Sequence, residues 1–410
     1  MEPEVRRLVE AAWRQINPAE LVGLARDLVR IPSVYRPGHP DGNESAVARY
    51  LVSCLRDDGF EVHTDDVAPG RPNVWALHRG TRPGRTLLFE AHTDVVTEGP
   101  GTAWRHPPFA AELVGRRLYG RGACDTKGNL AAAVVALRAI RRSGVPFPGR
   151  LILCCPVDEE GMMAGIKRFI RQGHAAGVDA AVICEPEGNE LCLTQKGALR
   201  IEVRVQGKMA HGAMPLSGVN PVTRAARFVA AVEALECEEI ARHGAHPLLG
   251  QPSITPTVLL CPEHGEPQLN VVPAGAYLAL DVRTIPGQSH PEIVDRLRGV
   301  IAALRAEDLL FEATLDVIDD RPWTQTGRDS PIARSAAIAY TAVTGEAPRY
   351  NGVPGATDGT FLHAWAGIPI VTTGAGDRLV PHQADEWVDV DELHLACRLY
   401  AATALQFCCS

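Results

Sequence analysis

The sequence has 410 residues, of which 46% are hydrophobic and 22% charged, and its 49 acidic and 41 basic side chains give a formal charge of −8. At about 100–200 residues per domain, this length predicts two or three domains with a sizeable core. The composition speaks against long disordered or collagen-like segments. The negative charge removes the electrostatic case for a nucleic-acid or membrane partner.

The first seven residues are polar, and no window holds the roughly 18 consecutive apolar residues of a membrane-spanning helix. We therefore expect a cytoplasmic protein. The 11 cysteines are an odd number and include the adjacent pairs Cys154–Cys155 and Cys408–Cys409, which is unlike the disulfide framework of a small secreted protein. We expect most of them to be reduced and buried.

Helices and buried strands alternate in the first half of the chain. Apolar residues at three- and four-residue spacing predict helices over residues 21–31, 44–55 and 127–140. Four apolar runs read as buried strands that end abruptly in polar side chains, over residues 86–94, 151–161, 181–186 and 368–374. The alternation predicts a largely parallel sheet, and the polar strand ends are expected to converge on a site.

The pattern changes after Gly197. Residues 199–206 alternate between apolar and polar, as in a strand with one solvated face. A helix (221–235), two strands (253–260 and 276–283), a helix (291–307) and a strand (311–318) follow, which is the β-α-β-β-α-β order of a ferredoxin-like unit. Helices over 331–344 and 391–406 complete the chain. We predict an α/β catalytic domain of residues 1–197 and 319–410, with residues 198–318 inserted into it.

Metal-ligand types of side chain stand at several of the strand ends. Alone, each has an ordinary explanation: a surface turn for His92 and for the acidic run, a strand-end glutamate for Glu185, and a loop histidine for His382. The glycine-rich segment 120–128 lacks the Gly-Lys-Ser/Thr of a phosphate-binding loop. Three successive acids after a buried strand, however, repel one another unless a cation is near. Together the imidazoles and carboxylates form a mixed N/O ligand set that zinc and its neighbours prefer. The candidates are His92, Asp94, Asp125, Asp158, Glu159, Glu160, Glu185 and His382.

In this order, the motifs His-x-Asp, Gly-Arg-Gly-x-x-Asp-x-Lys-Gly, Asp-Glu-Glu-Gly, Glu-Pro and a late His closely resemble the co-catalytic zinc family that includes aminoacylases, acetylornithine deacetylase, succinyl-diaminopimelate desuccinylase and glutamate carboxypeptidase. The resemblance covers nearly the whole chain, including a lid marked by residues 207–212, 270–273 and 281–283. It implies a mostly parallel-sheet catalytic domain that binds two divalent metals, most often zinc, with cobalt or manganese as alternatives. It also implies a homodimer through the ferredoxin-like lid.

The resemblance also implies residue roles. Two metals would lower the pKa of a bridging water, and the general base would take its proton during attack on the amide carbonyl and pass it to the leaving nitrogen. The peptide bond after the bridging aspartate is expected to be cis. In this scheme His92 and Glu185 bind one metal, Glu160 and His382 bind the other, Asp125 bridges both, Asp94 orients His92, and Glu159 is the general base.

Substrate contacts are implied in the same way. His211 resembles an electrophile for the tetrahedral oxyanion, and Asn270 and Arg283 resemble substrate-binding lid residues. A surface position in an arginine-rich chain explains Arg283 equally well. The glycines around Gly374 either approach substrate or simply turn the chain toward His382, and segment 352–359 departs slightly from the family's Gly-Gly-Thr-Ser/Thr-Asp.

Glutamate at position 185 is typical of the deacylases and glutamate carboxypeptidase of the resembled family, whereas many dipeptidases have aspartate and carbamoyl-amino-acid hydrolases have histidine. We therefore expect hydrolysis of a small N-acyl amino acid, with a carboxypeptidase or dipeptidase acting on short peptides as the alternative. Two other classes stay open at this point: a catalytically silent binding protein, and a thiol-based redox protein or hydrolase that uses Cys124 or Cys184.

Overall fold

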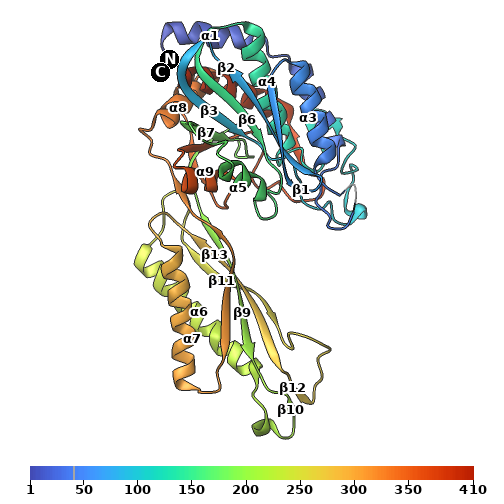
Figure 1. Cartoon of the computed structure of the whole chain (residues 1–410), viewed down its shortest axis with the longest axis vertical. Helices are drawn as coiled ribbons and strands as arrows, with labels where there is room; N and C mark the ends of the chain where they lie inside the picture. The colour runs from blue at the N-terminus through green and yellow to red at the C-terminus, as the bar shows by residue number, and fades with distance from the viewer. Residues whose placement is uncertain (40–41) are drawn as a thin grey trace. The chain divides into compact units, whose positions relative to one another are not determined.

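The computed structural model describes residues 1–39 and 42–410. The chain forms two compact units, one of residues 1–193, 325–353 and 357–410 and the other of residues 194–324 with 354–356 (Figure 1). The boundaries expected from the sequence, at 197/198 and 318/319, lie near the ends of the main segment of the second unit. Among the described residues, no helix has the length and apolarity needed to cross a membrane.

A sheet of nine strands runs through the first unit in the order β1-β2-β6-β3-β7-β17-β8-β15, with β16 paired to β8. The neighbours β6, β3, β7 and β17 run parallel to one another, whereas β1, β2 and β8 join antiparallel. The strands are β1 (Glu61–Ala68), β2 (Arg71–Arg79), β3 (Arg82–Glu90), β6 (Pro148–Cys155), β7 (Ala180–Ile183), β8 (Leu191–Gln195), β15 (Thr324–Gln325), β16 (Tyr350–Val353) and β17 (Ile370–Thr372).

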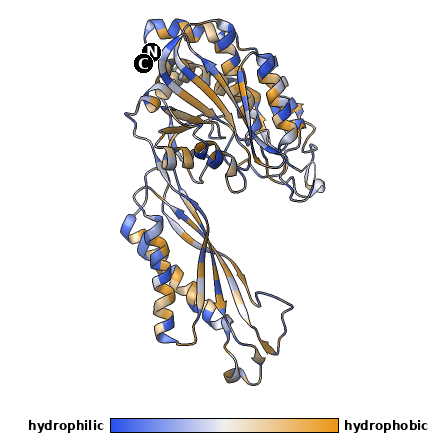
Figure 2. Cartoon of the chain, in the orientation of Figure 1, coloured by the Kyte–Doolittle hydropathy of each residue, from blue (hydrophilic) through white to orange (hydrophobic). Residues whose placement is uncertain are grey.

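Helices cover both faces of this sheet, which confirms the predicted mixed α/β fold (Figure 1). On β3, Leu87 and Phe89 pack into the larger core while Leu88 points into a smaller core on the other face. Strands buried on both faces read as continuous apolar runs, as the hydropathy in Figure 2 shows. The helices are α1 (Pro3–Trp13), α2 (Pro18–Arg30), α3 (Ser45–Asp57), α4 (Lys127–Ser143), α5 (Ala164–Arg171), α8 (Pro331–Thr344), α9 (Gly359–Ala366) and α10 (Val390–Cys409).

A small three-stranded sheet, in the order β18-β5-β4, also belongs to the first unit. Its strands are β4 (Glu112–Val114), β5 (Arg117–Tyr119) and β18 (Trp387–Asp389). Pairing of β18 with β5 brings the chain that follows His382 beside the chain that leads to the glycine-rich segment 120–128. Two segments far apart in the sequence are thereby held together.

The second unit is an antiparallel four-stranded sheet in the order β11-β13-β9-β14. Alternate residues of β9, such as Ile201 and Val203, are buried against Phe228 of α6 and Leu297 of α7, as the period-two pattern predicts. Two short strands, β10 and β12, which are distant in the sequence, pair as a separate two-stranded antiparallel sheet. The elements are β9 (Gly197–Gln206), β10 (Ala210–His211), α6 (Pro221–His243), β11 (Ser253–Leu260), β12 (Val271–Val272), β13 (Gly275–Thr284), α7 (His290–Glu307) and β14 (Ala313–Arg321).

Candidate metal centre

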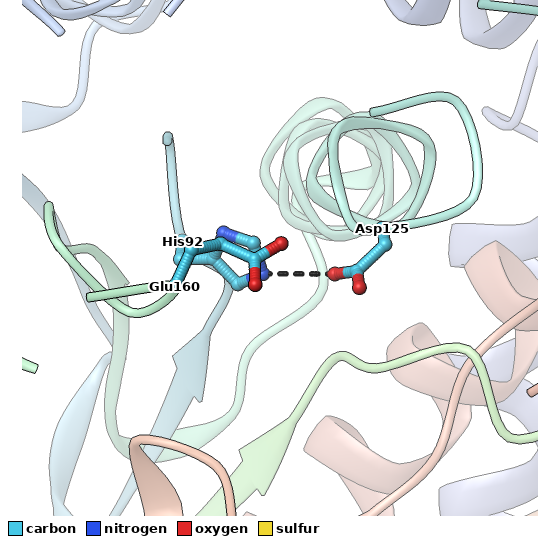
Figure 3. A group of neighbouring side chains, drawn as sticks. All are labelled: His92, Asp125 and Glu160. Carbon is cyan, nitrogen blue, oxygen red and sulfur yellow. Dashed lines mark hydrogen bonds and ion pairs between the residues drawn. The ribbon is translucent and has the colours of Figure 1, made fainter. Parts of the chain in front are cut away.

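Side chains of metal-ligand type meet at the carboxyl ends of the parallel strands, as the strand-end pattern predicts. His92 follows β3, Glu160 follows β6, and Asp125 immediately precedes the Thr126 N-cap of α4. The possible ligand atoms of these three residues lie within 4.8 Å of one another. Figure 3 shows the three side chains, with His92 Nε2 3.0 Å from Asp125 Oδ1.

Glu185 and His382 complete the group. Glu185 Oε1 lies 3.7 Å from His92 Nε2, is buried, and accepts no hydrogen bond within the described structure. His382 Nε2 lies 3.1 Å from the carboxylate of Glu160 and 3.4 Å from Asp125 Oδ2. Asp125 therefore presents one oxygen to each histidine, and the structure brings together all five residues that the resemblance implies as ligands.

The electrostatics of the group call for a cation. Burial raises the pKa values of Glu159 and Glu185 well above the usual glutamate value. Burial also acts to raise the pKa of Asp125, but hydrogen bonds from His382 and His92 outweigh it and lower that pKa. Hydrogen bonds with Asp125 and Glu160 raise the pKa of His382 to about 10. The crowded carboxylates thus favour the protonated, positively charged form of both imidazoles, and a divalent cation would offset the same repulsion. The orphaned oxygen of Glu185 and the mixed N/O donors fit such an ion.

The Asp94 carboxylate binds the backbone of the acidic turn, which is residues 158–161, and does not bind the imidazole ring. Its Oδ1 and Oδ2 accept the backbone N–H groups of Glu159 and Glu160, both at 3.1 Å. His92 Nδ1 lies 3.0 Å from the backbone carbonyl of Asp94 but 3.7 Å from its carboxylate. The predicted side-chain contact between Asp94 and His92 is therefore replaced by a main-chain one, because the carboxylate is already engaged by two amides. Either acceptor fixes the same ring tautomer.

Two residues that the sequence reasoning missed tie the ligand segments together. Glu386 Oε1 accepts the backbone N–H groups of Gly122, Cys124 and Asp125 at 2.9–3.0 Å, and its Oε2 accepts Arg121 Nη1 at 2.5 Å. Arg121 also donates to the carbonyl of His382 at 3.2 Å. Both side chains are buried. The only sequence signal was their position within the glycine-rich and late-His motifs. The Asp125–Thr126 peptide bond is cis, as predicted.

The residues predicted to contact substrate from the second unit do not all lie together. His211 pairs with Val271 across the two-stranded β10–β12 sheet, and the carbonyl of Asn270 accepts the N–H of Gly212 at 2.6 Å. His211 and Asn270 are therefore neighbours, and both are exposed. Arg283 lies near the far end of β13, where its Nε and Nη2 donate to the carboxylate of Asp281 at 2.5 and 3.0 Å.

Gly374 is buried beside Glu185. A Cβ at this position would lie 2.6 Å from the carbonyl oxygen of Glu185, 2.6 Å from Asn129 Oδ1 and 2.7 Å from the hydroxyl of Tyr400. The glycine therefore lets the loop after β17 pack against the backbone that carries Glu185. Its predicted contact with substrate stays a prediction.

The thiol-based alternative finds little support. All 11 cysteines are free, and seven of them are buried, as the composition predicts. Burial raises the pKa values of Cys124 and Cys184 well above the usual thiol value, so neither is a ready thiolate. The group of carboxylates and imidazoles is therefore a better candidate for the catalytic site than the cysteines.

A mixed α/β sheet whose parallel strand ends gather metal-ligand side chains and a neighbouring buried glutamate defines a metal-dependent hydrolase. The chain belongs to peptidase family M20/M25/M40, which matches residues 88–406, and it is accordingly a hydrolase of amide bonds. It is 32% identical to the succinyl-diaminopimelate desuccinylase of Gluconacetobacter diazotrophicus, over 92% of this chain and 94% of that protein.

Solved structures share the fold. The M20 family metallo-carboxypeptidase Sso-CP2 from Sulfolobus solfataricus has a TM-score of 0.79 at 18% identity, covering 95% of this chain and 99% of that one. The YXEP protein of Bacillus subtilis, described as a dinuclear metal-binding peptidase of the M20 family, has a TM-score of 0.68 at 18% identity, covering 95% and 97%.

Proposed function

We propose that this protein removes the acyl group from a small N-acyl amino acid at a centre of two divalent metal ions. The observation that carries the proposal is the position of Asp125, whose Oδ1 lies 3.0 Å from His92 Nε2 and whose Oδ2 lies 3.4 Å from His382 Nε2. His92 and Glu185 would hold one ion, Glu160 and His382 the other, with Asp125 between them. The mixed N/O donor set favours zinc, with cobalt or manganese as alternatives. The dinuclear centre named for the Bacillus subtilis relative supports the stoichiometry.

Glu159 is the proposed general base. When bound, the ions polarise the substrate carbonyl and lower the pKa of the attacking water. Glu159 accepts a proton from the attacking water and delivers it to the leaving nitrogen. This double role is favoured by a carboxyl group whose pKa is raised. Burial raises the pKa of Glu159 above the usual glutamate value, and the Asp94 carboxylate accepts the backbone N–H of Glu159.

The second unit is the proposed lid. Its chain order, β9-α6-β11-β13-α7-β14, and its strand order, β11-β13-β9-β14, support a ferredoxin-like assignment. His211 would stabilise the oxyanion, and Asn270 and Arg283 would bind substrate. Arg283 must then exchange Asp281 for a substrate carboxylate, a contact that its planar fork suits.

We also propose a cytoplasmic homodimer that forms through the lid. The edge strand β11 supports it, because Val258, Leu259 and Leu260 are 37%, 50% and 51% exposed there. An uncovered apolar strand edge of this kind invites pairing with a second chain.

The curated relative is a desuccinylase and the Sulfolobus relative a carboxypeptidase, so the substrate class needs a direct test. We would load the metal-free protein separately with zinc, cobalt and manganese and measure kcat/KM on N-succinyl and N-acetyl amino acids, dipeptides and N-blocked peptides. The proposal expects the highest values on an N-acyl amino acid and none without metal. Higher values on a dipeptide or a blocked peptide would replace it with the peptidase alternative.

A further inference from the structure

A buried arginine that lies outside the metal-ligand motifs in the sequence contacts the acidic turn in the structure. Arg71, the first residue of β2, is 7% exposed. Its Nε donates to Glu44 at 2.9 Å, and its Nη2 donates to Glu44 at 2.5 Å and to Asp158 Oδ1 at 2.8 Å. The ring of Tyr35 lies 3.6 Å from the guanidinium carbon. Arg71 thus sits between two buried carboxylates, with an aromatic face over its charge.

Asp158 organises the turn that carries Glu159 and Glu160. Its φ is +70°, and its Oδ2 accepts the backbone N–H groups of Met162 and Ala164 at 3.0 and 3.2 Å. The glycine of Asp-Glu-Glu-Gly is needed because a Cβ on Gly161 would lie 2.7 Å from Asp158 Oδ1. The turn is therefore folded around the Asp158 carboxylate.

A second β2 residue holds the flanks of the same turn. Asn73 Oδ1 accepts the N–H of Val157 at 3.1 Å, and Asn73 Nδ2 donates to the carbonyl of Gly165 at 2.8 Å. Residues two apart on a strand point to the same face, so Arg71 and Asn73 form one support. Asp94 holds the opposite side of the turn through the amides of Glu159 and Glu160.

We propose that Arg71, backed by Glu44, is a positioning residue: it neutralises and orients Asp158 and so fixes the backbone of the general base, an inference that rests on the proposed function. Three successive acids need positive charge nearby. The proposed metal ions would neutralise the carboxylate of Glu160, whereas Arg71 neutralises the carboxylate of Asp158. Without Arg71 the Asp158 carboxylate would be buried beside two further acids, and the turn would shift to relieve the repulsion. A displacement of about 1 Å in a reacting group can cost about 100-fold in rate.

The first test uses Arg71→Met, which keeps much of the buried stem and removes the charge. Arg168→Met is the matched control, because Arg168 makes a two-contact pair with Asp65, at 2.6 and 2.7 Å, in the same unit. Amide hydrogen exchange of the metal-free proteins reports the turn without any catalysis. We expect faster exchange across residues 157–165 in Arg71→Met and wild-type exchange there in Arg168→Met.

The second readout is steady-state kinetics of the metal-loaded proteins. We expect kcat of Arg71→Met to fall about 10- to 100-fold with a smaller change in KM, and Arg168→Met to match the wild type. Should Arg71→Met not fold, Arg71→Lys and Asp158→Asn replace it; Asn tolerates a positive φ, and each variant weakens the same contact. Exchange or kcat equal to that of the control would overturn the proposal. Activity of Glu159→Gln, measured in parallel, decides the proposed function separately, because the exchange result does not depend on it.

Discussion

Replacing Glu386 by glutamine should destabilise the first unit and weaken metal binding together. The Glu386 carboxylate is 1% exposed and accepts three backbone N–H groups, at 3.0, 2.9 and 3.0 Å, besides the pair with Arg121 at 2.5 Å. Glu386→Gln keeps the shape but leaves the Arg121 guanidinium, 2% exposed, without its buried counter-charge. Breaking one side of a buried ion pair costs about 3–5 kcal/mol. Because the same carboxylate holds the backbone of Asp125, metal affinity should fall about 10- to 100-fold.

Two measurements check this prediction. Urea unfolding of the metal-free protein gives the change in stability, and titration with zinc monitored by a competing chelator gives the affinity. Glu61→Gln is the control, because Glu61 pairs with Arg79 where the two side chains are 46% and 60% exposed, and such surface pairs contribute at most about 1 kcal/mol. If Glu386→Gln unfolds at the urea concentration of Glu61→Gln and binds zinc like the wild type, the reasoning about this carboxylate is refuted.

Gly374→Ala should lose about 1–3 kcal/mol of stability and part of the zinc affinity, because its Cβ meets the Glu185 carbonyl at 2.6 Å; urea unfolding and zinc titration equal to wild type would contradict this. Burial, with Arg141 nearby, lowers the pKa of His78 from 6.5 to about 4. Between these two pH values the unfolded chain binds more protons than the folded protein, so the free energy of unfolding falls as the pH drops from about 6.5 to about 4. His78→Phe should flatten that loss in urea midpoints, and an unchanged pH slope would count against it. Thiol alkylation of the folded protein should label exposed Cys237 first and leave activity intact, as peptide mass mapping and turnover would show.

The proposed ligands could be named from the sequence because their motifs resemble those of a known family, and because most of them flank an element with a clear apolar pattern. His92 and Glu185 stand just beyond buried strands, and the ends of parallel strands share one edge of a sheet. The adjoining β1 and β2 escaped prediction, since β1 is largely exposed and β2 carries Arg71, Asn73 and His78 among its apolar residues. Helix bounds shifted as well: α6 continues to His243, well beyond the expected residue 235.

The supports of the site were not accessible, because they depend on contacts between distant segments. Arg71 and Asp158 are 87 residues apart, and Glu386 and Asp125 are 261 residues apart. The three successive acids were expected to need a cation nearby, but the sequence does not reveal that Arg71 pairs with Asp158, the first of the three. Likewise, a His-x-Asp triplet leaves open whether the carboxylate or the carbonyl of Asp94 meets the imidazole, which the local turn geometry decides.

The most direct test of the central claim is the turnover of Glu159→Gln on the best N-acyl amino acid of the substrate panel, with metal content determined on the same samples. We expect the variant to retain the wild-type metal content while kcat falls by about 100- to 10,000-fold, the usual contribution of a general base. Unchanged turnover at unchanged metal content would contradict the assignment of Glu159 as the base.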